Sequence, residues 1–231
     1  MSLAGAGIIA IWNDITAEGR DNFYRWHEQQ HIPERVSIEG FLRGRRYIAQ
    51  SGGPEFYTLY EVRDRAVLSG EPYLQRLNSP TEWTTRSVQH FRNTSRSLCD
   101  VLFSAGNGSG GIIGTIRFDC APADDAAVLA RLTEDALPKL LEATGIVAAH
   151  VCRADLEAST VTTAEQKGRA ANLVPRWVMM VEGSLLEPVE AALAGPLGPT
   201  ALAAAGIAEA RHGIYRLEFD LLKAGGAPSA A

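Results

Sequence analysis

The sequence reads GIIAIWND at residues 7–14 and GIIGTIRFD at residues 111–119, and each of these similar stretches opens one half of the chain. Further along, HIPERVSIEGFLRGRRYIA in the first half has a counterpart in ALPKLLEATGIVAAHVCRA in the second. Pro33 precedes Gly40 by seven residues, and Pro138 precedes Gly145 by seven. Similar stretches in the same order indicate an internal repeat.

Hydrophobic patterning predicts the elements of the first half. Strands are expected at residues 7–12, 41–49, 56–62 and 98–104, and helices at residues 17–38 and 80–96. Thr16 suits the N-cap of the first helix and Gly40 suits its end, while Pro33 predicts a kink. The order β-α-β-β-α-β is that of a ferredoxin-like unit.

The second half is predicted to repeat this order. The expected organisation is a ferredoxin-like repeat at 1–104 carrying the WHxxxHxP motif, a Gly/Ser linker at 105–111, a diverged repeat at 112–223 and a disordered tail at 224–231. Residues 154–173 read as a mobile polar insertion. An antiparallel sheet with both helices on one face leaves its other face bare. We therefore expect an α+β protein in which the two bare sheet faces pack together as an α/β barrel within one chain.

Composition excludes several classes of protein. The hydrophobic fraction of 46% is typical of a globular chain. Three cysteines without a C-x-x-C pair indicate neither a disulfide framework nor a cysteine zinc site. A net charge of −5 argues against nucleic acid as a partner. No apolar run approaches the length of a membrane span and no basic leader opens the sequence, so a cytoplasmic protein without a membrane partner is expected.

The linker also contains Gly106-x-Gly108-x-x-Gly111, a formal match to the dinucleotide fingerprint. That fingerprint requires a helix directly after the glycines, because the helix N-terminus binds the pyrophosphate. The stretch that follows here is strand-like, so we do not expect a nicotinamide cofactor.

His27, Glu28 and His31 spell H-E-x-x-H, the signature of zinc peptidases. Spacing of i and i+4 places the two histidines on one helix face. A catalytic zinc needs a third protein ligand, and the continuation IPERVSIEG supplies neither the glycine nor the histidine of the extended motif. Pro33 also disturbs the helix beside His31. We therefore expect no metal and disfavour a peptidase.

The stretch FYRWHEQQHIPERVSIEGFLRGRRY, followed by the aromatic strand YTLYEV, resembles the dimeric α/β-barrel superfamily and, within it, EthD-like and related bacterial proteins. The residues that carry the resemblance are Trp26, His27, His31, Pro33, Gly40, Arg45 and Arg46. It covers about the first hundred residues. In the second half, Leu132 and Ala136 stand near the places of His27 and His31. The superfamily includes cofactor-independent monooxygenases, isomerases, haem-degrading enzymes and stress-response barrels, so the resemblance implies a fold more than a reaction.

The candidate catalytic residues are His27 and His31 as general base, with Arg46 or Tyr60 stabilising an oxyanion. The candidate ligand-binding residues are aromatic: Trp12, Phe23, Trp26, Tyr47 and Trp83. The alternative is structural, with hydrogen-bonded histidines and core aromatics. Glu61 has a formal counterpart in Glu182, which favours a shared structural role for that pair.

Three functions fit these observations. The first is a cofactor-independent monooxygenase, isomerase or similar enzyme that acts on a small aromatic or polyketide-like molecule. The second is a non-catalytic small-molecule-binding or scaffold barrel. The third is haem binding, with a histidine as the axial ligand. An exposed edge strand would also let two chains pair as a homodimer.

Overall fold

The computed structural model describes residues 2–165, 167 and 173–224. The strands of the first half are β1 Gly7–Ile15, β2 Phe41–Gly52, β3 Phe56–Val62 and β4 Phe91–Gly106. Its helices are α1 Arg20–Trp26, α2 Ile32–Ser37, α3 Glu71–Asn78 and α4 Glu82–Val88. Strand β3 has the bounds that the sequence predicted, and all of its mostly aromatic and apolar residues are buried.

The second half shows the same order of elements. Its strands are β5 Ile112–Phe118, β6 Ile146–Ala154, β7 Trp177–Gly183 and β8 Ala210–Leu222. Its helices are α5 Asp125–Ala130, α6 Leu137–Leu141, α7 Leu156–Thr160, α8 Leu186–Ala194 and α9 Pro199–Ala204.

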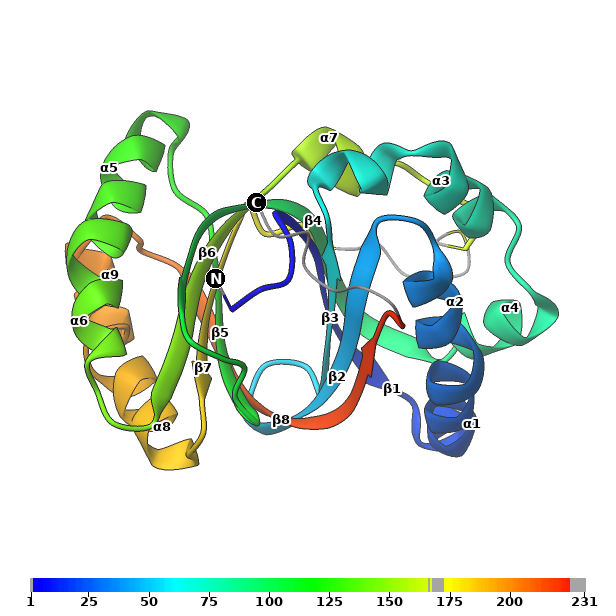
Figure 1. Cartoon of the computed structure of the whole chain (residues 1–231), viewed down its shortest axis with the longest axis horizontal. Coiled ribbons are helices and arrows are strands. Elements are labelled where there is room, and N and C mark those ends of the chain that lie inside the picture. The colour runs from blue at the N-terminus through cyan, green and yellow to red at the C-terminus, as the bar shows by residue number, and fades with distance from the viewer. Residues whose placement is uncertain (1, 166, 168–172, 225–231) are drawn as a thin grey trace.

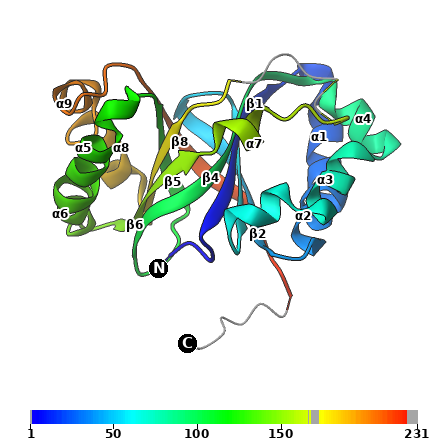
Figure 2. The same ribbon diagram turned by 90° about the horizontal axis from the view of Figure 1, so that it is seen from above.

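The eight strands form one closed barrel in the order β1-β3-β2-β8-β5-β7-β6-β4. Each half contributes four adjacent strands, and the β2–β8 and β4–β6 pairings join the two sheets. Helices α1 to α4 cover one side of the barrel, and α5, α6, α8 and α9 cover the opposite side (Figures 1 and 2). The predicted fold class, with two ferredoxin-like sheets packed into an intrachain α/β barrel, is confirmed.

The predicted helix at 80–96 is wrong in both its start and its end. Within that range α4 spans only Glu82–Val88 and strand β4 begins at Phe91, while α3 lies before the range. Helix α4 is capped by Thr81, whose hydroxyl oxygen accepts a hydrogen bond from the backbone N–H of Thr84 at 3.1 Å. Residues 94–97 are polar but lie in a buried strand, because distant parts of the chain form hydrogen bonds with them. Local sequence patterning gives no information on such contacts.

A π-helical turn lies in the first helical segment of each half, at His27–His31 and at Arg131–Ala136. Each turn ends two residues before a proline, Pro33 or Pro138. Proline has no N–H with which to continue the α-helical ladder, and a widened turn absorbs the missing hydrogen bond. The turn in the first half therefore belongs to the fold, and its presence alone is no sign of function.

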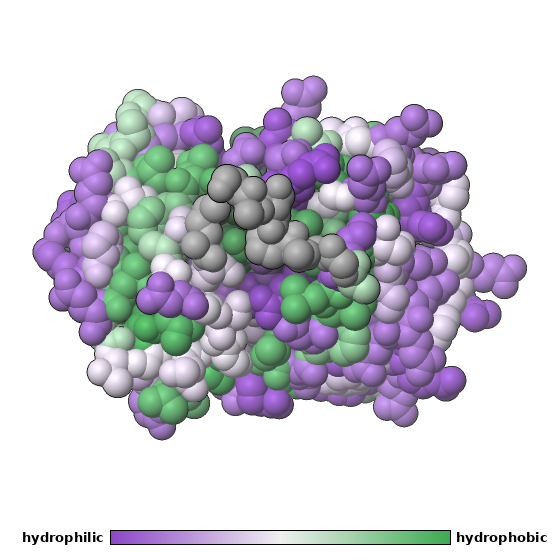
Figure 3. All heavy atoms as spheres, viewed as in Figure 1, coloured by the Kyte–Doolittle hydropathy of each residue, from purple (hydrophilic) through white to green (hydrophobic). Residues whose placement is uncertain are grey.

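The hydrophobic core has three layers. The barrel interior is packed by aromatic and aliphatic side chains, among them Trp12, Tyr57 and Met180. Outside the barrel, each sheet packs against its own helices. On the face shown in Figure 3, hydrophobic residues gather on the left, over the helices of the second half, while the outer surface of the first half is mainly hydrophilic.

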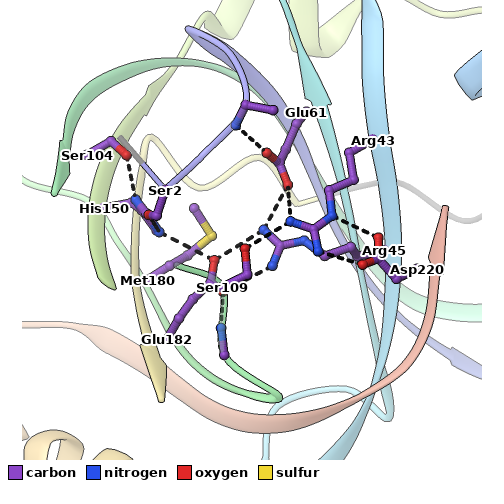
Figure 4. A network of polar contacts seen from close by, with 12 residues as sticks. Ser2, Arg43, Arg45, Glu61, Ser104, Ser109, His150, Met180, Glu182 and Asp220 are labelled. Carbon is purple, nitrogen blue, oxygen red and sulfur yellow. Dashed lines mark hydrogen bonds and ion pairs between the residues drawn. The ribbon is translucent and has the colours of Figure 1, made fainter. Parts of the chain in front are cut away.

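A layer of buried charges lies inside the barrel where the two sheets meet (Figure 4). The Arg45 guanidinium lies 2.8 Å from Glu61 Oε1 and 3.1 Å from Glu182 Oε2. His150 Nε2 lies 3.4 Å from Glu182 Oε1. These four side chains have no exposed surface. Ions buried this deeply are tolerated when they are paired and hydrogen-bonded, as they are here.

The structure bears on several predictions about the linker, the termini and the edges of the sheet. Strand β4 runs to Gly106, so it includes the first two residues of the predicted linker. Residues 225–231 of the tail predicted at 224–231, and residues 166 and 168–172 of the insertion, lie outside the described residues. Among the eight described strands each has two neighbours, so the exposed edge on which the homodimer prediction rested is not found. Within the described residues no helix could span a membrane, and the cytoplasmic location stays a prediction.

Candidate functional site

A small cavity lies between the sheet and the helices of the first half. Its volume is about 20 Å³, room for about one water molecule. Strands β1, β3 and β4 form its floor, and the π-helical turn with helices α2 and α3 forms its walls. Its lining is unusually polar for a protein core: Asn13, His27, His31, Arg35, Thr58, Tyr60, Tyr73, Arg96 and Glu165.

The two histidines lie on the cavity wall, held by aromatic rings. The His27 ring stacks on Phe23 at 4.8 Å between ring centroids, and the His31 ring lies 4.2 Å from Trp26. The two imidazoles are roughly parallel, with centroids 5.6 Å apart. Both residues are at most 5% exposed. The predicted stripe of Phe23, His27 and His31 is therefore present, and its polar end faces the cavity.

Two arginines complete the polar lining. Arg35 forms an ion pair with Glu165, and both side chains are almost fully buried. Burial is the largest single influence and lowers the pKa of Arg35, but the attraction of Glu165 together with the smaller contributions of Tyr73, Tyr60 and Glu34 outweighs it, and the net pKa is raised. On the sheet side, Arg96 Nη2 donates to the Tyr73 hydroxyl at 2.9 Å. The cavity thus contains two cations, and only Arg35 has a carboxylate partner among the described residues.

Residues 155–165 of the second half cover this cavity of the first half. Asp155 donates its N–H to the Leu98 carbonyl at 2.8 Å, and Leu98 N–H donates to Ser159 Oγ at 3.0 Å. Further along, Glu165 N–H donates to the Leu77 carbonyl at 3.0 Å. Strand β6 pairs with β4 only from Cys99 onward, so this segment satisfies the part of β4 that β6 leaves free. We call residues 155–165 the covering segment.

The corresponding space in the second half is filled by apolar side chains. The strand register and the helix positions align the two halves of the chain. Residues of β1 and of the first helical segment correspond to residues 105 positions later, residues of β3 to residues 121 positions later, and residues of β4 to residues 116 positions later. The pairs are His27 and Leu132, His31 and Ala136, Arg35 and Leu140, Asn13 and Phe118, Thr58 and Met179, and Tyr60 and Val181. Arg96 is equivalent to His212. The same scaffold is therefore built without this polar set.

Three of the nine predicted site residues meet at the cavity: His27, His31 and Tyr60. Phe23 and Trp26 pack behind the histidines. Trp12 and Tyr47 point into the barrel interior and are separated from the cavity by the sheet. These roles stay predictions, because no observation of a bound ligand tests them.

Arg46 and Trp83 do not line the cavity. The Arg46 guanidinium donates to Glu28 Oε1 at 2.6 Å and to Glu218 Oε2 at 3.3 Å, and it lies 4.4 Å from the centre of the Tyr24 ring. Trp83 Nε1 donates to Asn22 at 2.8 Å. Sequence reasoning missed Arg35, Arg96 and Glu165. Only Arg35 left a signal, because it lies four residues after His31 on the same helical face.

The cavity does not suit a metal or a haem. Across the described ranges, no three His, Cys, Asp or Glu side chains form a group that could hold a metal ion. His27 and His31 stack ring on ring, whereas two ligands of one metal point their nitrogens at a common centre. A space of about 20 Å³ is far too small for a porphyrin.

Several solved structures have the same fold as this chain. An anthrone oxidase-like protein matches 99% of both chains with a TM-score of 0.65 and 15% identity. A proposed monooxygenase from Fusobacterium nucleatum matches 95% of both chains, with a TM-score of 0.59 and 9% identity. The chain has the dimeric α/β-barrel fold. A proposed chlorite dismutase shares this fold, with a TM-score of 0.53 and 12% identity over 95% of this chain and 96% of its own.

The dimeric α/β-barrel fold is here contained in one polypeptide, which confirms the fold that the resemblance implied. No family model and no curated protein matches the sequence. At these levels of identity the likeness concerns the fold alone, and the reaction has to be argued from the cavity.

Proposed function

We propose that the chain is a cofactor-independent enzyme of the EthD-like type, which removes a proton from a small aromatic or polyketide-like molecule. The observation that carries this proposal is the contrast between the two halves. Burying polar groups costs free energy, and the second half shows that apolar residues fill the same space. A polar set retained in one half alone points to a task other than folding.

The residues of the cavity divide into roles. His27 or His31 acts as the general base, because imidazole titrates near neutral pH and both rings border the cavity. Arg96 and the Tyr60 hydroxyl stabilise the negative charge that develops on the substrate oxygen. Arg96 takes the role first considered for Arg46, whose guanidinium is already held by two glutamates.

The fold neighbour named anthrone oxidase-like supports an aromatic ketone as substrate class. Removal of a proton from the methylene group of anthrone gives an aromatic enolate. Dioxygen then oxidises that carbon, and anthrone with one O₂ gives anthraquinone and one water. No resident cofactor is needed, because the enolate itself donates electrons to oxygen.

The cavity must enlarge to admit such a molecule. A second hollow of about 90 Å³ adjoins it and shares the side chains of Tyr73, Leu77 and Arg96. Ligand sites commonly measure about 300–1,000 Å³. Substrate entry therefore requires the covering segment and Tyr73 to move. The small volume is also the observation that favours the alternative function, a scaffold or binding barrel without chemistry.

The experiment is oxygen uptake with anthrone, corrected for its uncatalysed oxidation. The variants are His27→Ala and His31→Ala, with His90→Ala as the control, since His90 lies in the first half but outside the cavity and bonds Thr16. The proposal expects uptake by the native protein, a loss of at least about a hundredfold in one cavity variant and no change in the control. Equal rates in all four proteins would support the scaffold alternative.

A further inference from the structure

Arg117 differs from the buried arginines Arg35, Arg45 and Arg46, each of which forms an ion pair. It lies on β5 four residues after Ile113, so both side chains are on the same face of the strand and point into the barrel. Arg117 is 6% exposed. Ile113 pairs with Glu182, and Arg117 lies four residues further along the strand, toward the end of the barrel away from the layer in Figure 4. The charges of that layer are paired, whereas Arg117 forms no ion pair with any residue that the structure describes.

The surroundings of Arg117 leave its guanidinium without an acidic partner among the described residues. The group lies 4.7 Å from the centre of the Trp12 ring, and its Nε is buried without a hydrogen bond. By contrast, Arg35, Arg45 and Arg46 each form ion pairs. Burial and the nearby charge of Arg211, offset in part by Tyr215, lower the pKa of Arg117. An unpaired buried cation is costly unless a ligand supplies the missing charge.

A second cation lies beside the first. Arg211 is the β8 partner of Arg117 in the strand register, is exposed and forms no ion pair with a described residue. Two hollows of about 560 and 530 Å³ adjoin at this end of the barrel, and both arginines line each of them. Ser95 Oγ lines the larger hollow and is buried without a hydrogen-bond partner among the described residues. Two cations and a hydroxyl thus border space large enough for a small molecule.

The carboxylates nearby do not neutralise this pair. Asp14 accepts from Glu55 N–H and from Asn93 Nδ2, each at 2.6 Å, and Asp119 accepts from Arg176 N–H at 2.9 Å. Asp124 and Glu209 line the larger hollow but are exposed to solvent. The 530 Å³ hollow has Asp14 as its only carboxylate among the described residues.

We propose that Arg117 and Arg211 bind a small oxyanion, a carboxylate or a phosphate, at this end of the barrel. Guanidinium groups bind both oxyanions in a bidentate manner. The sheet separates this site from the histidine cavity, and the proposal is independent of the function proposed there.

The test is isothermal titration calorimetry with inorganic phosphate and, separately, with benzoate, at constant ionic strength maintained with chloride. The variants are Arg117→Met and Arg211→Gln, with Arg216→Gln as the control, because Arg216 is an exposed arginine of opposite parity on the same strand. The native protein and the control are expected to bind at least one probe saturably, and both site variants at least tenfold more weakly. The probe that binds identifies phosphate or carboxylate as the ligand class.

Two results would overturn the proposal: no saturable binding of either probe by the native protein, or unchanged affinity in the site variants. Arg117→Met removes an unpaired buried charge, so its melting temperature is expected to rise in the absence of ligand. The probe that binds should raise the melting temperature of the native protein but not that of Arg117→Met. If Arg117→Met failed to fold, Arg211→Gln, at an exposed position, would decide the question.

Discussion

Glu61 and Glu182 occupy equivalent positions on β3 and β7, and both carboxylates contact the guanidinium of Arg45. The equivalence extends to their other partners. Glu61 accepts the N–H of Ala4 just before β1, and Glu182 accepts the N–H of Gly110 just before β5. The arginine of one half therefore neutralises a glutamate from each half, which ties the two sheets together at one end of the barrel.

Replacing Arg45 with methionine should destabilise the fold by about 3–5 kcal/mol at pH 7, since the two buried carboxylates would then lose their shared cation and Glu61 would keep only the more distant Arg43, at 3.9 Å. Urea unfolding measures this change. The control is Arg63→Met, whose ion pair with Asp64 is exposed on both sides. Its cost should not exceed about 1 kcal/mol. Equal losses in the two variants would mean that the layer does not depend on Arg45.

Glu182 should make the free energy of unfolding depend on pH in the acid range. Burial opposes its ionisation, but the hydrogen bond from His150 and the charge of Arg45 outweigh burial and lower its pKa from 4.5 to about 2. The ionised carboxylate therefore stabilises the fold fully above pH 4.5, and this contribution is lost as the pH falls through 2. Its size is about 3 kcal/mol.

The measurement is the free energy of unfolding from pH 7 to pH 2 for the native protein and for Glu182→Gln. The variant should be less stable at neutral pH and should lose less stability on acidification. Glu190→Gln, at an exposed position of α8, serves as the control and should follow the native curve. Parallel curves for Glu182→Gln and the native protein would contradict this role for Glu182.

The sequence was sufficient to predict the barrel because its evidence is local and repeated. Strand β3 is a short run rich in aromatic and apolar residues, and Gly40 and Gly145, each with a positive φ, both lie in the turn between a helix and the strand that follows it. The failure at 80–96 has a non-local cause. Ser97 and Arg96 in β4 bond Pro175 and Leu173, nearly eighty residues away, so a buried strand there has a polar sequence.

The candidate site, like the fold, was predictable where the evidence for it is local in sequence. The sequence pattern placed His27 and His31 on one face of a single helical segment. It also named Tyr60, on a strand of the sheet that this helix covers, as a candidate site residue. Glu165 reaches the same cavity from the second half, in a segment that read as a mobile polar loop. Its position depends on backbone bonds to Leu77, which no local pattern reports.

The ion pair between Glu165 and Arg35 should hold the covering segment closed. Glu165→Gln leaves buried Arg35 with only the more distant carboxylate of Glu34, at 4.0 Å, which favours local opening. Hydrogen exchange at the Glu165-position and Asp155 amides should then accelerate at least tenfold, equivalent to about 1.4 kcal/mol. The control is Glu157→Gln on the exposed side of α7. If both variants exchanged like the native protein, another contact would hold the segment.

The central claim is that the polar cavity of the first half serves chemistry and not folding. The most direct test gives the first half the residues of the second, as the double variant His27→Leu with His31→Ala, and measures unfolding free energy and anthrone-dependent oxygen uptake on the same sample. The account predicts stability within about 1 kcal/mol of native, because apolar side chains suit this layer, and oxygen uptake at the uncatalysed rate. Native uptake, or a loss of more than about 3 kcal/mol, which is the scale of a structural defect, would contradict it.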